Sequence, residues 1–273
     1  MNKSGHILIR VLCIGVLLTC CGGYPHAEGT PAGSEPNAAQ AAEPGETIVL
    51  LQGMGRGRAS LWVLDTRLRQ AGYSVVTFPY MAHSHSIDDL AGQLCALLKA
   101  QIHGGRYHLI AHSFGNVIIR AAFRAGLPEG LGRIVMLAPP NQPADLVRAL
   151  SDNRIYQWFT GESGQELASS EFYEQLPVPP VEFGVIAGNR GQSFMLKEPN
   201  DGVISLEQTK LEGMTDWVAV DQSHNFIMNS KIVAQLCASF IETGHFDRQL
   251  LALPEENPPV EPTNDPQEGE QAP

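Results

Sequence analysis

Short apolar runs alternate with amphipathic stretches along residues 47 to 244. Each apolar run has the length of a buried strand; the runs are 47–52, 74–80, 107–111, 133–138, 182–188 and 216–221. The stretches with apolar side chains at helical spacing are 59–72, 86–102, 116–126 and 230–244. Because buried strands that alternate with helices form a parallel sheet covered on both faces, we expect an α/β fold with about six strands.

The two ends of the chain have a different composition. Residues 22 to 46 and 254 to 273 are rich in Pro, Glu and small residues and contain almost nothing to bury. They carry ten acidic residues and no Lys or Arg. After these ten and the two bases Lys3 and Arg10 are set aside, about -3 of the formal charge of -11 belongs to residues 47 to 253. We therefore expect one folded domain over 47–253, a disordered tether over 21–46 and a disordered acidic tail over 254–273. No basic track suited to a nucleic acid is present.

The N-terminus MNKSGHILIRVLCIGVLLTCCGG predicts an export signal, because two basic residues precede an apolar stretch too short to span a bilayer. The segment ending in Cys20-Cys21 resembles the lipobox of bacterial lipoproteins, although Cys20 stands where Gly or Ala is usual. The resemblance implies a signal peptide over 1–20, an acylated Cys21, and a lipoprotein of the bacterial envelope that faces the periplasm. An uncleaved membrane-associated N-terminus is the alternative; the intact mass of the mature protein distinguishes the two.

IVLLQGMGRGR at 48–58 takes a strand into a loop with glycines at 53, 55 and 57. Such loops present backbone N–H groups to anions, and a nucleotide phosphate is the first candidate. The dinucleotide pattern G-x-G-x-x-G would need glycine where Arg58 stands, and neither its acidic ribose partner nor a G-K-[ST] sequence follows. A plain turn without a ligand remains the alternative.

A-H-S-F-G at 111–115 lies between a predicted strand and a predicted helix and matches the nucleophile elbow G-x-S-x-G, with Ala111 in the first glycine position. The tight elbow turn accepts only small residues two positions from the serine, and both Ala111 and Gly115 are small. We expect Ser113 to be a catalytic nucleophile. The alternative is that Ser113 only caps the following helix.

A serine nucleophile needs a base and an orienting acid, which follow it in the order acid, then histidine. Asp201 lies in an Asn-Asp-Gly turn after one predicted strand, and His224 follows the last predicted strand, so both lie at the sheet edge of Ser113. We expect these two residues to complete a triad. The competing acids are Glu198, Asp216 and Asp221, and the competing histidines are His83, His85, His103, His108, His112 and His245.

The segments QGMGR, AHSFG, LAPPNQ, NDGVIS and HNFIM occur in this order between residues 52 and 228. Together they resemble the α/β-hydrolase fold of bacterial lipases and esterases, in particular small members with H-G-L-G-R, T-H-S-M-G, L-A-P-P-N-Q, N-D-G-V-V-S and H-T-F-M-M. The resemblance implies a sheet without the first hairpin of larger relatives and supports Ser113, Asp201 and His224. Gln52 departs from it, since the relatives carry His there. Substrate is left open, because this fold cleaves esters, thioesters and amides.

The fold implied by this resemblance stabilises a tetrahedral oxyanion with two backbone N–H groups, which here would be those of Met54 and Phe114. Arg56 and Arg58 follow in the same loop and could bind a substrate carboxylate or phosphate, brace the loop, or point into solvent. We expect no metal or other cofactor: His83 and His85 form an H-x-H pattern, but the residues that complete a metallohydrolase site are missing.

Two further features bear on fold and substrate. Cys95 and Cys237 suggest a disulfide, because exported proteins often contain them. The resembling fold, however, places their helices on opposite faces of the sheet, too far apart for a bond, so we expect two buried free thiols. Residues 140 to 180 are expected to form a small cap whose apolar side chains either line an acyl pocket or pack in the core; they are Leu150, Ile155, Trp158, Phe159, Phe172 and Tyr173.

The sequence therefore predicts a cofactor-free serine hydrolase that cleaves apolar carboxylic esters of small molecules or lipids through an acyl-enzyme. A thioesterase or acyltransferase with the same triad is the first alternative. A catalytically idle envelope protein that binds a partner is the second. Partner proteins, oligomeric state and the natural substrate are not predicted.

Overall fold

The computed structural model describes residues 46–82, 85–102, 105–142, 170–191 and 198–252. The expected export signal, Cys21, almost all of the tether, the acidic tail and the cap residues Leu150, Ile155, Trp158 and Phe159 lie outside these ranges.

Six parallel strands form one sheet, which confirms the expected α/β class. They are β1 (Thr47–Leu51), β2 (Ser74–Phe78), β3 (Tyr107–His112), β4 (Leu131–Leu137), β5 (Phe183–Gly188) and β6 (Asp216–Val220). Their order in the sheet is β2-β1-β3-β4-β5-β6, and each neighbouring pair is parallel. All the strands therefore end at one edge, where ligands of such sheets bind.

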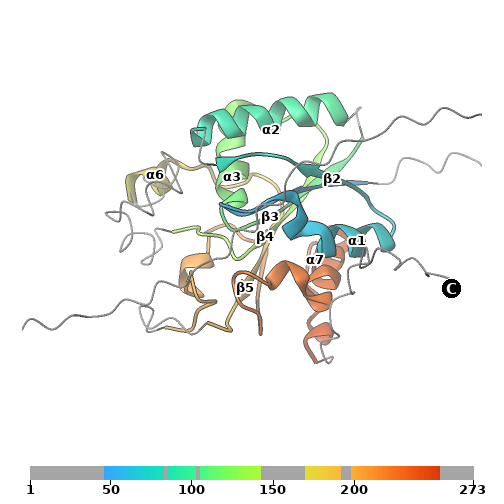
Figure 1. Cartoon of the computed structure of the whole chain (residues 1–273), viewed down its shortest axis with the longest axis vertical. Coiled ribbons are helices and arrows are strands. Elements are labelled where there is room, and N and C mark those ends of the chain that lie inside the picture. Colours follow the sequence, from blue (N-terminus) through green and yellow to red (C-terminus); the bar gives the residue numbers. More distant parts are fainter. Residues whose placement is uncertain (1–45, 83–84, 103–104, 143–169, 192–197, 253–273) are drawn as a thin grey trace, which may run out of the picture. The chain divides into compact units, whose positions relative to one another are not determined.

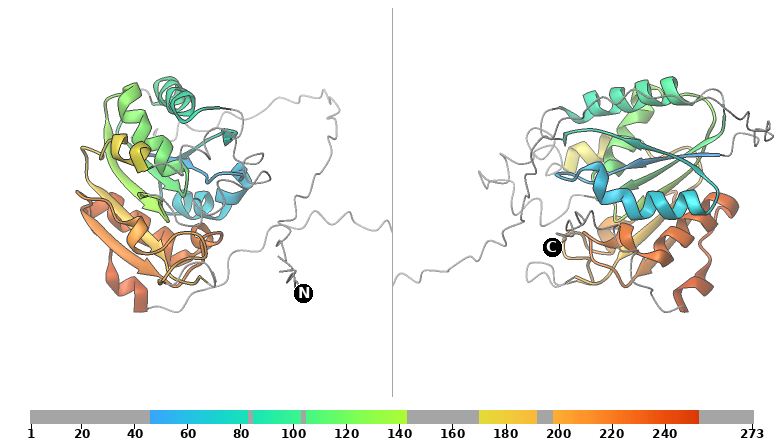
Figure 2. Two further views of the ribbon diagram at one scale, coloured as in Figure 1. Left: turned by 90° about the vertical axis from the view of Figure 1, so that its left-hand side faces the viewer. Right: turned by 45° about the vertical axis from the view of Figure 1, so that its right-hand side comes forward.

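Helices cover both faces of the sheet (Figures 1 and 2). α2 (Ile87–Gln101) and α3 (Gly115–Ala125) pack on one face, whereas α1 (Trp62–Gln70) and α7 (Lys231–Thr243) pack on the other. Side chains of β1 alternate between two hydrophobic clusters, Val49 and Leu51 on the α2 face and Ile48 and Leu50 on the α7 face. This double burial explains why the strand is apolar at every position from 48 to 51.

Local signals explain where the helices begin and end. The Ser86 hydroxyl accepts a hydrogen bond from the Asp89 N–H at 3.2 Å and caps α2. The stretch predicted as one helix over 59–72 is in fact a 3-10 turn (Arg58–Leu61) followed by α1, because Ser60 bonds back to the Gly57 carbonyl and tightens the first turn. α1 ends just before Gly72, whose φ of 97° suits glycine.

Smaller elements complete the described part of the chain. They are α6 (Ser170–Gln175) and 3-10 turns at Glu207–Thr209, Ile227–Asn229 and Arg248–Ala252. Tyr173 on α6 is buried in the α2-face cluster, and Phe172 packs against that cluster, so both serve the core. None of the helices among the described residues is long and apolar enough to cross a bilayer.

Cys95 and Cys237, the two cysteines of the described ranges, are free thiols, as expected. Cys95 lies on α2 and Cys237 on α7, so they belong to the clusters on opposite faces of the sheet. Both are buried, and burial raises the pKa of each thiol. They are therefore poor nucleophiles in the folded protein.

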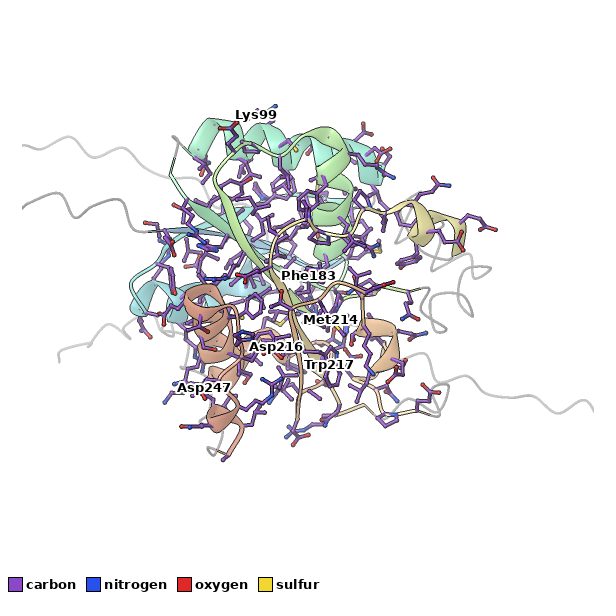
Figure 3. The ribbon with its side chains drawn as sticks, turned by 180° about the vertical axis from the view of Figure 1, so that it is seen from behind. Lys99, Phe183, Met214, Asp216, Trp217 and Asp247 are labelled. Carbon is purple, nitrogen blue, oxygen red and sulfur yellow. The ribbon has the colours of Figure 1, made fainter. Side chains whose placement is uncertain are left out.

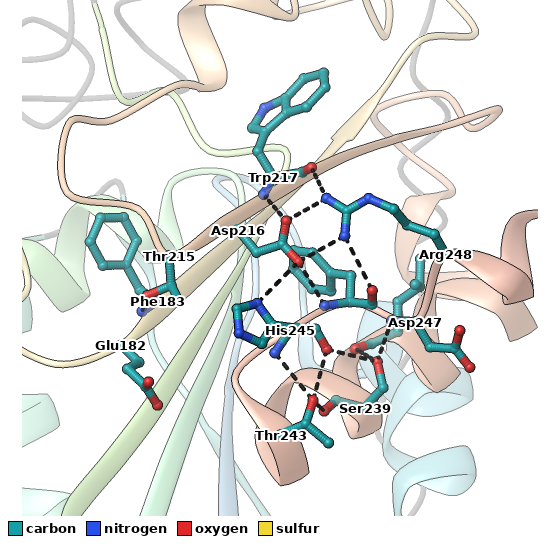
Figure 4. Close-up of polar contacts among 12 residues, drawn as sticks. Glu182, Phe183, Thr215, Asp216, Trp217, Ser239, Thr243, His245, Asp247 and Arg248 are labelled. Atoms are coloured by element: carbon teal, nitrogen blue, oxygen red, sulfur yellow. Dashed lines mark hydrogen bonds and ion pairs between the residues drawn. The ribbon is translucent and has the colours of Figure 1, made fainter.

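Asp216 at the start of β6 anchors the segment that follows α7 (Figures 3 and 4). Its carboxylate accepts hydrogen bonds from the Phe246 N–H at 2.8 Å and from the Arg248 guanidinium, and the Trp217 N–H also donates to it. Phe246 in turn packs against Phe240 of α7, with ring centroids 4.9 Å apart. This network holds the last described residues to the sheet at the edge opposite the strands' carboxyl ends.

Asp216→Asn is expected to lower the free energy of unfolding by about 2 kcal/mol at neutral pH, because a charged acceptor strengthens each of these hydrogen bonds. Burial alone would raise the pKa of the carboxyl, but the bonds from Arg248, Phe246 and Trp217 outweigh it and hold the pKa below its usual value. A carboxyl with a depressed folded-state pKa contributes stability above its unfolded pKa and loses it as pH falls through the folded pKa.

The difference between wild type and Asp216→Asn should therefore shrink as the pH is lowered below about 4. Urea unfolding at neutral and acidic pH measures it. Asp88→Asn is the matched control, since Asp88 pairs with Arg124 on the surface and its side chain is 77% exposed. A loss of stability that is the same at every pH would contradict the ionic account.

Candidate active site

Ser113 lies in a tight turn between β3 and α3, at the carboxyl edge of the sheet. Its φ of 51° is in the left-handed region, which a non-glycine residue adopts only under strain. Gly115 lies so close to β1 that a Cβ there would stand 2.8 Å from the Gln52 carbonyl oxygen. The N-cap of α3 is Phe114, so Ser113 is not the capping residue. The turn has the geometry of the predicted elbow.

The structure brings Ser113, His224 and Asp201 together. His224 Nε2 lies 2.9 Å from Ser113 Oγ, and His224 Nδ1 lies 2.7 Å from Asp201 Oδ2. The serine and histidine are separated by 111 residues along the chain. Asp201 is 2% exposed and His224 6%, so the two are shielded from bulk water. This is the hydrogen-bonded order of nucleophile, base and orienting acid.

The loop around Asp201 fixes the orientation of its carboxylate. Oδ1 accepts hydrogen bonds from the N–H groups of Val203 and Ile204 at 2.9 and 2.8 Å, which leaves Oδ2 for His224. The His224 N–H donates to the Asp201 carbonyl at 2.8 Å and joins the two loops. Because the carboxylate accepts from Nδ1–H, the Nε2 lone pair faces the serine hydroxyl.

The competing acids lie elsewhere. Asp216 holds Arg248 at the opposite edge of the sheet, and Asp221 forms an exposed ion pair with Arg190. Glu198 is exposed. Among the described residues considered as the acid, only Asp201 reaches His224.

His112 contacts the candidate site in a way that sequence reasoning missed. Its Nε2 lies 2.9 Å from the His224 carbonyl oxygen, and the two rings are 4.9 Å apart. Burial first, and then the charges of His224 and Arg56, lower the pKa of His112 well below its usual value. The ring is therefore neutral at pH 7, and its Nε2–H donates to that carbonyl. His112 supports the backbone of His224 instead of acting as the base.

The other competing histidines that the structure describes contact other groups. His108 lies near Glu46, with His108 Nε2 3.1 Å from Glu46 Oε2. His245 lies 3.9 Å from Asp216. His85 contacts the Met81 carbonyl. His83 and His103 lie outside the described residues.

The expected oxyanion donors belong to the loop after β1 and to the elbow. Neither the Met54 N–H nor the Phe114 N–H has a hydrogen-bond acceptor among the residues that the structure describes. Gln52 braces the first loop: its Nε2 donates to the Tyr80 carbonyl at 3.0 Å, and the Tyr80 hydroxyl donates to the Gln52 carbonyl. Gln52 stands where the resembling proteins carry histidine, and through these two hydrogen bonds it anchors the loop.

The described part of the chain contains no cluster of three or more His, Cys, Asp or Glu side chains that could hold a metal ion. The H-x-H pattern is described only at His85, since His83 lies outside the described ranges. The described side chains bring together a hydroxyl, an imidazole and a carboxylate, and the two N–H groups expected as oxyanion donors belong to the elbow and to the loop after β1.

Comparison with solved structures finds similar folds in several hydrolases. The mature lipase BlEst2 of Bacillus licheniformis is 15% identical with a TM-score of 0.63, over 78% of this chain and 96% of that one. The esterase EaEST of Exiguobacterium antarcticum is 13% identical with a TM-score of 0.56, over 73% and 93%. A putative thioesterase of Silicibacter is 16% identical with a TM-score of 0.51, over 71% and 73%.

At these identities the likeness shows a shared fold and no shared substrate. No curated protein matches the chain. The model of the alpha/beta hydrolase family matches residues 48–227, which include Ser113, Asp201 and His224. The chain therefore belongs to the alpha/beta hydrolase family.

Proposed function

We propose that the protein is a serine hydrolase that cleaves carboxylic esters through an acyl-enzyme intermediate. The observation that carries the proposal is the hydrogen-bonded series Ser113–His224–Asp201, with distances of 2.9 and 2.7 Å. A serine hydroxyl is a weak nucleophile by itself, and such a series is the arrangement that activates it.

In the proposed reaction, Ser113 Oγ attacks the ester carbonyl carbon while His224 Nε2 takes the hydroxyl proton. The carbonyl oxygen becomes an oxyanion, which the N–H groups of Met54 and Phe114 stabilise. The intermediate collapses, the ester bond breaks, and His224 gives its proton to the leaving alcohol. Water then attacks the acyl-enzyme with His224 again as the base, which releases the carboxylic acid and restores Ser113. Asp201 stabilises the imidazolium in both halves.

Apolar acyl groups are the substrate class we propose. Two large apolar side chains are exposed near parts of the candidate site: Phe226, two residues after His224, is 60% exposed, and Met81, which follows the Gln52 partner Tyr80, is 62% exposed. Single exposed apolar residues are common, but one after His224 and one beside the partner of the first loop favour an apolar ligand.

Purified protein should hydrolyse 4-nitrophenyl esters and react with a fluorophosphonate probe. We expect stoichiometric labelling at Ser113, because the probe reports a serine that is activated by a base and placed beside oxyanion donors. Peptide mapping identifies the labelled residue, and rates on esters of increasing chain length measure the acyl preference. Absence of both labelling and hydrolysis would reject the proposal and favour the idle binding protein.

Thioester cleavage or acyl transfer is the second candidate, because the same three groups serve it and one similar fold is a putative thioesterase. Matched oxygen esters and thioesters of equal chain length separate these activities.

We also propose that Cys21 is acylated and anchors the protein in the bacterial envelope; an intact mass without a lipid adduct would exclude this. The basis is the sequence of the N-terminus alone.

A further inference from the structure

Arg56 lies in the loop that carries the proposed oxyanion donor Met54. The loop folds back on itself, since the Arg56 N–H donates to the Gly53 carbonyl at 3.4 Å and Gly55 between them has a φ of 68°. Gly53 in turn contacts the elbow: a Cβ built on it would lie 2.7 Å from His112 Nδ1 and 3.3 Å from Ser113 Cβ. The backbone of Arg56 is thus one hydrogen bond away from a residue that touches the nucleophile.

The Arg56 guanidinium is half-buried and has no hydrogen bond or ion pair with any described residue. Other arginines of the described ranges differ in this respect. Six form ion pairs with carboxylates: Arg69, Arg106, Arg124, Arg133, Arg190 and Arg248. The buried Arg120 donates to the carbonyls of Leu176 and Pro177. Arg58 is exposed, so water solvates its charge.

The charge of Arg56 also acts on the candidate site. Burial lowers its own pKa, with no carboxylate among the described residues to offset the effect, and its charge lowers the pKa of His112. A guanidinium that is partly withdrawn from water and lacks a counter-ion gains stability when an anion binds. The location, and a charge that no described residue pairs with, together favour an anionic ligand at the oxyanion-loop side of Ser113.

We propose that Arg56 forms an anion subsite beside Ser113 and selects ester substrates that carry a carboxylate or phosphate group near the ester bond. This inference rests on the proposed esterase activity and narrows its substrate class. Arginine suits the role because its planar guanidinium binds both oxyanions through two parallel N–H···O bonds. Apart from this anionic group, the substrate is the apolar ester proposed above.

Matched substrates test the subsite on either side of the ester. 4-Nitrophenyl hexanoate and the mono-4-nitrophenyl ester of adipic acid differ by a carboxylate at the end of the acyl chain. A 1-acylglycerol and its 3-phosphate differ by a phosphate on the alcohol. The readout is the ratio of kcat/KM for the anionic and the neutral member of each pair, measured at low and high salt.

Arg56→Gln should lower this ratio about 10- to 100-fold in at least one pair, as expected for the loss of a charge-assisted hydrogen bond. Arg56→Lys should retain part of the preference, and high salt should reduce it in wild type. Arg58→Gln is the matched control from the same loop and should leave the ratio unchanged. Ratios that are the same in wild type and Arg56→Gln for both pairs would overturn the proposal.

A binding measurement separates this proposal from the esterase activity. Calorimetry with phenyl phosphate should detect binding to wild type and to Arg58→Gln, with affinity lowered about 10-fold or more in Arg56→Gln. Binding that depends on Arg56 without any ester hydrolysis would support the subsite and reject the proposed activity. The protein could instead hydrolyse neutral esters but bind phenyl phosphate equally in all variants, or not at all. That outcome would reject the subsite and leave the esterase activity standing.

Discussion

Ser113→Ala should reduce kcat for ester hydrolysis by about 10⁵-fold or more, the largest effect that we expect of any single substitution. The alanine lacks the oxygen that forms the acyl-enzyme, so His224 and Asp201 retain no nucleophile to activate. Only the backbone donors and substrate binding remain, and these by themselves accelerate hydrolysis far less. Burst and steady-state kinetics with 4-nitrophenyl esters measure the loss, and the burst of product should disappear with the acyl-enzyme.

Ser74→Ala is the control, because Ser74 is an exposed serine at the start of β2, at the opposite end of the strands. It should keep full activity. Ser113→Ala should also keep the fold, since it removes a single oxygen and leaves Gly115 and Asn116 to hold the turn. Equal esterase activity in Ser113→Ala and wild type would refute the nucleophile and favour another site.

The fold was predictable because its main signal is local. Residues 48 to 51 of β1 are all apolar since both faces of the strand are covered, and the Ser86 cap and the Gly72 stop act within a few residues. The elbow is similar: a small residue at 111 and glycine at 115 around Ser113 are visible in five letters, and the turn needs them for steric reasons. Such features require no knowledge of distant contacts.

The supports of the candidate site could not be predicted, because they depend on residues far apart in the chain. The His112 contact with the His224 carbonyl spans 112 residues, and the Gln52 and Tyr80 pair spans 28. The buried Arg120 satisfies its guanidinium with backbone carbonyls, so no acidic residue in the sequence could have indicated its partners. The sequence predicts the three side chains of the hydrogen-bonded series, but it does not indicate which residues hold these side chains in place.

Asp201→Asn should lower kcat by about 10⁴-fold while leaving the fold intact, because it changes the tautomer of His224. The N–H groups of Val203 and Ile204 donate to Oδ1, so they would hold the oxygen of the asparagine amide there. The amide nitrogen would then face His224 Nδ1 and donate to it. With Nδ1 acting as an acceptor, the proton moves to Nε2, and the imidazole can no longer accept the proton of Ser113.

Asp221→Asn is the matched control: it is another Asp-to-Asn change after a strand of the same sheet, but Asp221 is exposed and pairs with Arg190. It should retain at least half of the wild-type kcat, and so should Glu198→Gln. The comparison tests the choice of acid directly, since a catalytic Asp221 or Glu198 would reverse the result. Asp201→Ala adds a further distinction, because it removes the charge without placing an amide N–H against His224 Nδ1. If Asp201→Ala is more active than Asp201→Asn, the wrong tautomer of His224, and not only the missing charge, accounts for part of the loss.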